Sequence, residues 1–228
     1  MDSLKKILTY FGFKKKAVVY TAIFGNYDDL KEAPKIRGCD FLCFTDNVDL
    51  KSNTWKIIRR KNVFDNAVLD AKLYKILFYK FVGEYEMSLW IDGSMQLKAI
   101  DMGYLAEKYL AKNNLAVFKH PERNCVYQEA DICVDLQKDK EAVIRKQMDK
   151  YKKDNYPCDN GLISGGFILR KNEIDVKNFC DKWWEEVNSF SKRDQLSFNY
   201  LAWKYNFNYN IIDDIIWEND LVKVYNHK

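Results

Sequence analysis

The sequence lacks the features that divide a chain into parts or carry it across a membrane. Among 228 residues there are only three prolines and nine glycines, and no segment rich in proline, glycine or serine resembles a linker. We therefore expect one domain over residues 17–228. No apolar run approaches the length that spans a bilayer, and the amino end has no secretory signal pattern. These absences favour a cytoplasmic protein.

Cysteine pairs and a strong excess of charge are also missing. The six cysteines form no CxxC pair, so neither a zinc site nor a disulfide framework is predicted. The net charge is only +4, with lysines interleaved among acids, which predicts no nucleic-acid partner but leaves an anionic small molecule open. The chain is instead rich in hydrophobic residues, 47% of the total, and aromatic residues alone make up 15%. This composition predicts a packed core.

The amino end, residues 1–16, has a composition of its own. Residues 4–16 combine apolar and basic side chains, as helices that lie on a membrane surface do. One interpretation is a peripheral contact with the inner membrane surface. The other is a frayed basic lead-in to the first strand.

Apolar runs alternate with segments of helical periodicity along the rest of the chain. Such runs predict strands at 17–24, 40–44, 55–58, 87–91, 115–118 and 161–170. The helical periodicity predicts helices at 66–81, 102–112, 139–151, 176–189 and 193–203. This alternation is typical of the α/β class, with a mostly parallel central sheet flanked by helices.

Polar residues follow several of the predicted strands. They are Gly25 to Asp29, Asp46, Asp92 and His120. Because open sheets of this kind bind ligands at the carboxyl ends of their strands, we expect these residues to share one ligand-binding edge.

Asp92 is the leading candidate among them. The apolar strand 87–91 delivers its carboxylate to an abrupt turn at Gly93. A carboxylate suits Mg²⁺ or Mn²⁺, and such a cation neutralises the charge that builds on a diphosphate leaving group. The alternative is that Asp92 only opens a turn, since Asp-Gly is ordinary turn chemistry.

An ordered set of segments along the chain carries a family resemblance. The segments are 20–28, 44–46, 71–72, 90–94, 120–130, 161–166 and 193–198. In this order they are similar to the TOD1/mucilage-related family of glycosyltransferase-like domains, and the likeness covers nearly all of the chain after about residue 17.

The resemblance implies a GT-A-like fold, in which a Rossmann-like nucleotide-binding half is continuous with an acceptor-binding half. It also implies transfer of a sugar from a nucleotide-sugar donor to a glycan or other hydroxyl acceptor, as in polysaccharide biosynthesis. Mn²⁺ or Mg²⁺ is the cofactor that such a fold usually carries.

The chain departs from the common GT-A pattern at the metal site. Many GT-A enzymes have Asp-x-Asp after this strand, whereas Asp92-Gly93-Ser94 supplies one carboxylate. Ser94, water and diphosphate oxygens would complete the coordination shell. His227, near the carboxyl end, is the second predicted metal ligand, and the alternative is that it is only a tail residue.

Residues from several segments are predicted to bind the nucleotide-sugar donor. The turn after the first strand offers backbone amides and a tyrosine ring to a nucleotide, and Lys72 offers a point charge to phosphate. The donor-binding candidates are Thr21, Gly25, Asn26, Tyr27, Asp46, Lys72, Asp92, Gly165 and Gly166. The competing interpretations are an Asx turn at Asp46, a solvated helix lysine at Lys72 and a β-bulge at the paired glycines.

Two further groups complete the predicted site. His120, Arg123, Tyr127 and Glu129 are predicted to bind acceptor hydroxyls or the diphosphate, although a packed loop would look similar. Asp194 is the catalytic candidate, as the proton acceptor of an inverting enzyme or as a stabilising group in a retaining one. The alternative is that Asp194 caps the helix that it begins.

A non-catalytic nucleotide-sugar or glycan-binding module is the competing function. It would bind a donor without transferring the sugar.

Overall fold

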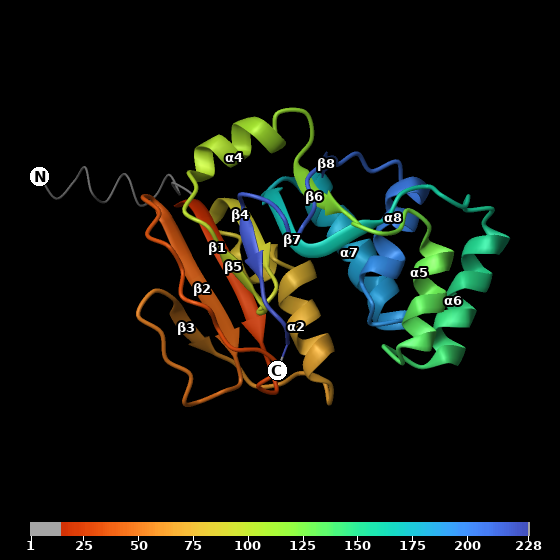
Figure 1. Ribbon diagram of the computed structural model, residues 1–228, viewed down its shortest axis with the longest axis horizontal. Coiled ribbons are helices and arrows are strands. Elements are labelled where there is room, and N and C mark those ends of the chain that lie inside the picture. The colour runs from red at the N-terminus through yellow and green to blue at the C-terminus, as the bar shows by residue number, and fades with distance from the viewer. Residues whose placement is uncertain (1–14, 228) are drawn as a thin grey trace, which may run out of the picture.

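The computed structural model describes residues 15–227, and a seven-stranded sheet forms its centre (Figure 1). In spatial order the strands are β3 (Lys56–Arg59), β2 (Cys39–Thr45), β1 (Lys15–Ile23), β4 (Tyr85–Ile91), β7 (Ile163–Lys171), β6 (Leu115–Lys119) and β8 (Asn210–Ile212). Strand β7 runs antiparallel to its neighbours, and the remaining pairs are parallel. The prediction of a mostly parallel sheet is confirmed.

Strand β1 shows why a continuous apolar run becomes a central strand. It pairs with β2 on one side and with β4 on the other. Successive residues Val18, Val19 and Tyr20 are all completely buried, because each face of the sheet is covered.

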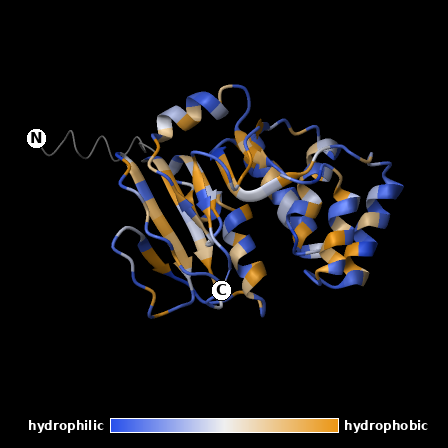
Figure 2. Ribbon diagram, in the orientation of Figure 1, coloured by the Kyte–Doolittle hydropathy of each residue, from blue (hydrophilic) through white to orange (hydrophobic). Residues whose placement is uncertain are grey.

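The helices cover both faces of the sheet. Those that carry the larger core are α2 (Ala67–Ile76), α3 (Tyr79–Val82), α5 (Val126–Asp135), α6 (Glu141–Lys153), α7 (Ile174–Ser189) and α8 (Gln195–Lys204). On the opposite face lie α4 (Met102–Tyr109) and a small antiparallel ribbon of β5 (Met95–Leu97) and β9 (Val222–Val224). Figure 2 shows hydrophobic residues along the central strands, with hydrophilic residues on the outer sides of the helices.

The predicted helix at 66–81 is two helices. Asn66 caps α2 by accepting hydrogen bonds from the amides of Val68 and Leu69, but the helix ends at Ile76 and α3 begins at Tyr79. All residues from 74 to 78 are buried. A continuous helix buries only one stripe of side chains, so the break allows this whole stretch to enter the core.

Helix α5 falls between residues 120 and 138, where the sequence predicts no helix. Its N-cap residue, Cys125, makes no side-chain capping bond, so the usual start signal is missing. The three-residue strands β5, β8 and β9 were also missed. Helix α6 lies within the predicted range 139–151 apart from its last two residues, and it buries Ile144, Met148 and Tyr151.

The amino-terminal prediction lies mostly outside the described residues. Strand β1 already begins at Lys15, and residues 4–14 of the basic segment precede the described part of the chain. None of the helices between residues 15 and 227 is both long and apolar enough to cross a bilayer.

The sheet topology brings distant segments to one edge. Strands β1, β2, β4 and β6 end there, and antiparallel β7 begins there. The amide of Asp92 donates to the carbonyl of Gly166 at 2.9 Å. The carboxyl-terminal segment reaches the same edge, because His227 contacts Asp28 in the turn after β1.

Candidate functional site

Two adjoining cavities occupy this edge of the sheet. The first has a volume of about 140 Å³ and the second about 310 Å³. Lys72, Asp92, Arg193 and His227 line both of them. The two cavities therefore form one continuous cleft.

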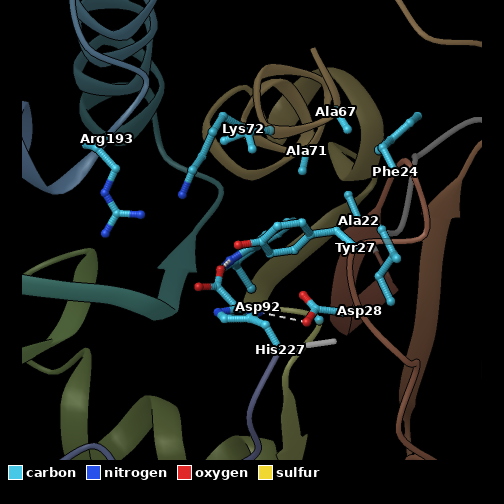
Figure 3. Close-up of a pocket in the computed structure, with 14 residues that line it drawn as sticks. Ala22, Phe24, Tyr27, Asp28, Ala67, Ala71, Lys72, Asp92, Arg193 and His227 are labelled. Carbon is cyan, nitrogen blue, oxygen red and sulfur yellow. Dashed lines mark hydrogen bonds and ion pairs between the residues drawn. The ribbon is translucent and has the colours of Figure 1, made fainter. Parts of the chain in front are cut away.

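The first cavity has an apolar end and a charged end (Figure 3). Ala22, Phe24, Ala67 and Ala71 form the apolar end, and the basic side chain of Lys72 follows beyond them. A flat apolar ring fits the first part and an anionic group fits the second.

Asp92 presents a carboxylate with one oxygen engaged. Its Oδ1 accepts a 2.7 Å hydrogen bond from the Trp90 indole and lies 3.5 Å from Lys75 Nζ. A Cβ added to Gly166 would lie 3.4 Å from Oδ2, so that oxygen faces a position without a side chain. The side chain keeps 33% of its surface exposed. Asp92 is therefore held in place and still accessible.

Behind Asp92 lies a buried chain of alternating charges. Asp194 Oδ1 is 2.7 Å from Lys72 Nζ, and its Oδ2 is 2.6 Å from Lys75 Nζ. The side chains of Lys75 and Asp194 are only 1% and 2% exposed. The order Lys72, Asp194, Lys75, Asp92 alternates in sign, and Asp92 is its most exposed member.

These ion pairs change the proton affinities of the groups. Burial would raise the pKa of Asp194, but Lys72 and Lys75 outweigh it and hold that pKa well below its usual range. Burial lowers the pKa of Lys72 to about 8 against the attraction of Asp194. The pKa of Lys75 is raised, because Asp194 and Asp92 outweigh the opposing effect of burial.

The geometry contradicts the capping interpretation of Asp194 and weighs against a role as proton acceptor, whereas a role as a stabilising group stays a prediction. Its side chain makes no capping hydrogen bond to α8. As a proton acceptor it would be weak, because both carboxylate oxygens are paired with lysines and its pKa is lowered. Its observed contacts are those of a buried counter-ion.

The paired glycines lie in a β-bulge. Val117 of β6 pairs with Ile168, yet the next residue, Phe118, pairs with Ser164. Gly165 and Gly166 fall within the skipped stretch. A Cβ at Gly166 would lie 2.2 Å from Met95 Cε, and one at Gly165 would lie 3.0 Å from Lys75 Nζ. Side chains of Met95 and Lys75 thus occupy the space that a Cβ at either glycine would enter.

The predicted turn after β1 is stabilised from β2. Gly25 and Asn26 have positive φ angles of 62° and 53°, and the Gly25 amide donates to both carboxylate oxygens of Asp46 at 3.1 Å. This turn presents Tyr27 to the first cavity. Gly25, Asn26 and Asp46 shape the turn but do not line the cleft, and Thr21 is buried in β1 away from it.

His227 joins the site from the carboxyl-terminal segment. Its Nδ1 lies 2.8 Å from Asp28 Oδ1, and its ring centroid is 5.0 Å from that of Tyr27. Figure 3 shows Asp28, Asp92 and His227 around the same side of the cavity.

The residues predicted to bind the acceptor divide into two groups. His120, Arg123 and Glu129 line the second cavity, where Arg123 Nε donates to Glu129 at 2.7 Å. Burial lowers the pKa of His120, and its Nδ1 accepts hydrogen bonds from the amides of Glu122 and Arg123. Tyr127 lies apart from the cleft and donates to the Tyr156 carbonyl at 2.8 Å.

Sequence reasoning missed two cations of this site. Lys75 pairs with both Asp92 and Asp194, and Arg193 lines both cavities. Lys75 follows Lys72 by three residues, a spacing that puts both on one helix face. That spacing was the available signal for Lys75, whereas Arg193 begins the segment 193–198 of the family resemblance but was given no role of its own.

The metal-ligating side chains of the site fit a divalent cation that is coordinated jointly by the protein and a bound phosphate ligand. Between residues 15 and 227 no group of three or more histidine, cysteine, aspartate or glutamate side chains is arranged to hold a metal. Mg²⁺ and Mn²⁺ in phosphate-binding sites commonly take only one or two protein carboxylates, with phosphate oxygens and water as the other ligands. The accessible oxygen of Asp92 meets that requirement.

Comparison with known proteins agrees with this architecture. The bifunctional glycosyltransferase WbbM in its apo form has a similar fold, with a TM-score of 0.50 and 12% sequence identity, over 89% of this chain and 39% of that one. The fold is thus the GT-A-like fold of glycosyltransferases.

The family follows from sequence comparison. The model of the TOD1/MUCI70, glycosyltransferase-like domain matches residues 5–227, and the chain belongs to this family. Two relatives are proteins of Arabidopsis thaliana. "Probable hexosyltransferase MUCI70" is 27% identical over 80% of this chain and 36% of its own length. "Alkaline ceramidase TOD1" is 26% identical over 81% of this chain and 47% of its own. The chain thus spans less than half the length of each.

Proposed function

We propose that this protein is a glycosyltransferase that moves a sugar from a nucleotide-sugar donor to a hydroxyl group of a glycan or other acceptor. The observation that carries the proposal is the composition of the cleft. An apolar end, two cations and an accessible carboxylate follow one another along it. A nucleoside, a diphosphate and a metal-bound oxygen require these surroundings in the same order.

The donor nucleoside lies in the first cavity under this proposal. Its base packs against the small side chains of Ala22, Ala67 and Ala71, with the exposed ring of Tyr27 as the facing wall. The diphosphate then meets Lys72 and Arg193, which line the junction of the two cavities. Two cations at this point stabilise the charge that develops on the leaving group.

Asp92 and His227 would hold the divalent cation, Mn²⁺ or Mg²⁺. When bound, the cation supplies further neutralisation of the departing diphosphate. The Trp90 indole and Lys75 orient the Asp92 carboxylate through Oδ1 and leave Oδ2 for coordination. Asp194 acts behind this site as a positioning residue, because its two oxygens hold the lysines in place.

The acceptor approaches from the second cavity. Arg123, His120 and Glu129 offer charged hydrogen-bonding groups on its wall. Gly165 and Gly166 line this cavity at the β-bulge, and their lack of side chains leaves space next to Asp92.

A screen of nucleotide sugars tests the function. A ligand that binds only the folded state raises the melting temperature, so we expect one donor to do so, and more strongly with Mn²⁺. The same donor should then be hydrolysed slowly or transferred to added acceptors, as detected by mass spectrometry. The Asp92→Asn variant should keep its fold and lose the Mn²⁺-dependent part of the shift.

Two other outcomes point to other functions. Donor binding without turnover under any metal would indicate the non-catalytic module, for which the single carboxylate after β4 is the supporting feature. Because one relative bears the name of a ceramidase, ceramide hydrolysis is assayed in parallel. Ceramide hydrolysis, without a rise in melting temperature on addition of any nucleotide sugar, would refute the proposed transferase function.

A further inference from the structure

We propose that the indole of Trp217 is the stacking platform for a sugar ring of the acceptor, so that the second cavity takes a carbohydrate. This inference rests on the proposed transferase function and names its acceptor class. It concerns a residue that the donor site does not use, because Trp217 lines the second cavity and not the first.

Trp217 is unusual among the tryptophans of the described chain. Its exposed fraction is 54%, whereas Trp90 and Trp183 are buried. The next most exposed, Trp203 at 38%, packs against Tyr156 with 5.3 Å between ring centroids. Trp217 stacks on no other aromatic ring within residues 15–227, so a large apolar surface is left to water.

The turn that carries the indole is rigid. Ile215 and Glu218 form an isolated β-bridge, and the neighbouring Ile216 is 1% exposed. The Asn219 side chain donates to the carbonyls of Ile215 and Ile216. Its Oδ1 accepts from the amides of Leu221 and Val222 at 2.8 and 2.9 Å. The fold therefore fixes this turn on both sides and leaves its indole exposed.

The surroundings of the indole suit a pyranose. A sugar ring has an apolar face of C–H groups and a rim of hydroxyls, so its site needs an aromatic face and polar groups around it. Trp217 provides the face, and Arg123 and Glu129 on the same cavity provide charged partners. The cavity volume of about 310 Å³ lies within the range of small-ligand sites.

The position also suits the chemistry of transfer. The second cavity shares Asp92 and Lys72 with the first. A ring on Trp217 lies in the same cleft as the donor sugar, and one of its hydroxyl oxygens forms the new bond to the anomeric carbon. The diphosphate leaves with the electron pair of the broken bond, and the hydroxyl proton passes to water or to the phosphate.

The test uses the full chain and a panel of defined tetrasaccharides of glucose, galactose, mannose, xylose and galacturonic acid. Binding is measured by calorimetry, and transfer is measured with the donor found in the nucleotide-sugar screen. We expect Trp217→Ala to weaken the binding of the best tetrasaccharide by about tenfold or more. Trp217→Phe keeps an aromatic face and should stay within about threefold of the unchanged protein.

Two controls separate this inference from the proposed function. Tyr205 is also half exposed, at 50%, and lines a different cavity, so Tyr205→Ala should leave tetrasaccharide binding unchanged. Donor-induced stabilisation should persist in Trp217→Ala. If no donor stabilises either the unchanged protein or the variants, the proposed transferase function fails independently of Trp217.

Several results would overturn the inference. One is that no tetrasaccharide binds the unchanged protein, and another is that Trp217→Ala binds it equally well. A third is loss of donor binding in Trp217→Ala, which would move the indole to the donor site. Binding of ceramide-containing vesicles that Trp217→Ala abolishes would assign the surface to a lipid instead.

Discussion

Removal of Lys75 tests the buried charge chain most directly. Lys75 Nζ lies 2.6 Å from Asp194 in nearly complete burial. At this distance and an effective dielectric constant of about 20, the attraction is roughly 6 kcal/mol. Desolvation of both ions offsets part of it, and loss of one partner from such a pair typically costs about 3–5 kcal/mol. We expect Lys75→Met, which keeps the shape of the side chain, to lower the free energy of unfolding by about this amount.

Urea denaturation followed by circular dichroism measures the change in the free energy of unfolding. An unaltered m value, the slope of that free energy against urea concentration, shows that the folded state stays compact. Lys182→Met is the matched control. Its ion pair with Glu185 is 3.0 Å long but exposed, with side chains 45% and 63% accessible, so the variant should change stability by less than about 0.5 kcal/mol. A loss of less than about 1 kcal/mol in Lys75→Met would refute the assignment of a strongly coupled buried pair.

The double variant Lys75→Met with Asp194→Asn checks the same reasoning. Asp194→Asn alone leaves Lys72 and Lys75 without their shared counter-charge. The two lysines then repel each other, and removal of Lys75 relieves that repulsion. The loss of unfolding free energy in the double variant should therefore be smaller than the sum of the losses in the two single variants by about 1–3 kcal/mol. Simple additivity would mean that the two side chains act independently.

Three further predictions concern the cleft. Asp92→Asn should abolish the Mn²⁺-dependent stabilisation by the donor. It should have little effect on the melting temperature without ligand, because the carboxylate is partly exposed. A large loss of stability without ligand would make Asp92 a structural residue. Since the pKa of Lys72 is lowered to about 8, its cation is present below that pH and is lost above it. Donor affinity, measured by calorimetry with Mg²⁺, should therefore be constant up to about pH 8 and then fall by up to about tenfold per pH unit, whereas Lys72→Arg should remove this dependence. Gly166→Ala should cost about 1–3 kcal/mol through contact with Met95, and Met95→Ala should restore part of the loss; an unchanged urea midpoint would disprove the predicted clash.

The sequence predicted the larger elements because their signals are local. Strand β1 is a run of apolar residues, and α2 begins at a capping asparagine. Both signals lie within a few residues of the element they define. Where such signals are weak, prediction failed, as at α5 with its uncapped start and at the three-residue strands.

The candidate site was predicted in part. Its edge followed from residues at strand ends, and Tyr27, Lys72, Asp92 and Gly165 are among the predicted residues that line the cleft. The lysine partners of Asp194 did not follow from the sequence, since its helix-start position gives no sign of them. Thr21 and Tyr127 have suitable chemistry but point into packed regions away from the cavities.

The sequence by itself determined the class of fold, the family and the edge of the sheet where the cleft lies, because hydrophobic periodicity and short ordered motifs are properties of neighbouring residues. Only the tertiary structure decided the partners of each charge. Asp194 meets Lys72 across 122 positions of sequence, and His227 meets Asp28 across 199. Such encounters depend on the order of strands in the sheet and on which side chains lose contact with water. Burial then fixes the charge chain behind Asp92, because a buried ion is stable only beside its partner.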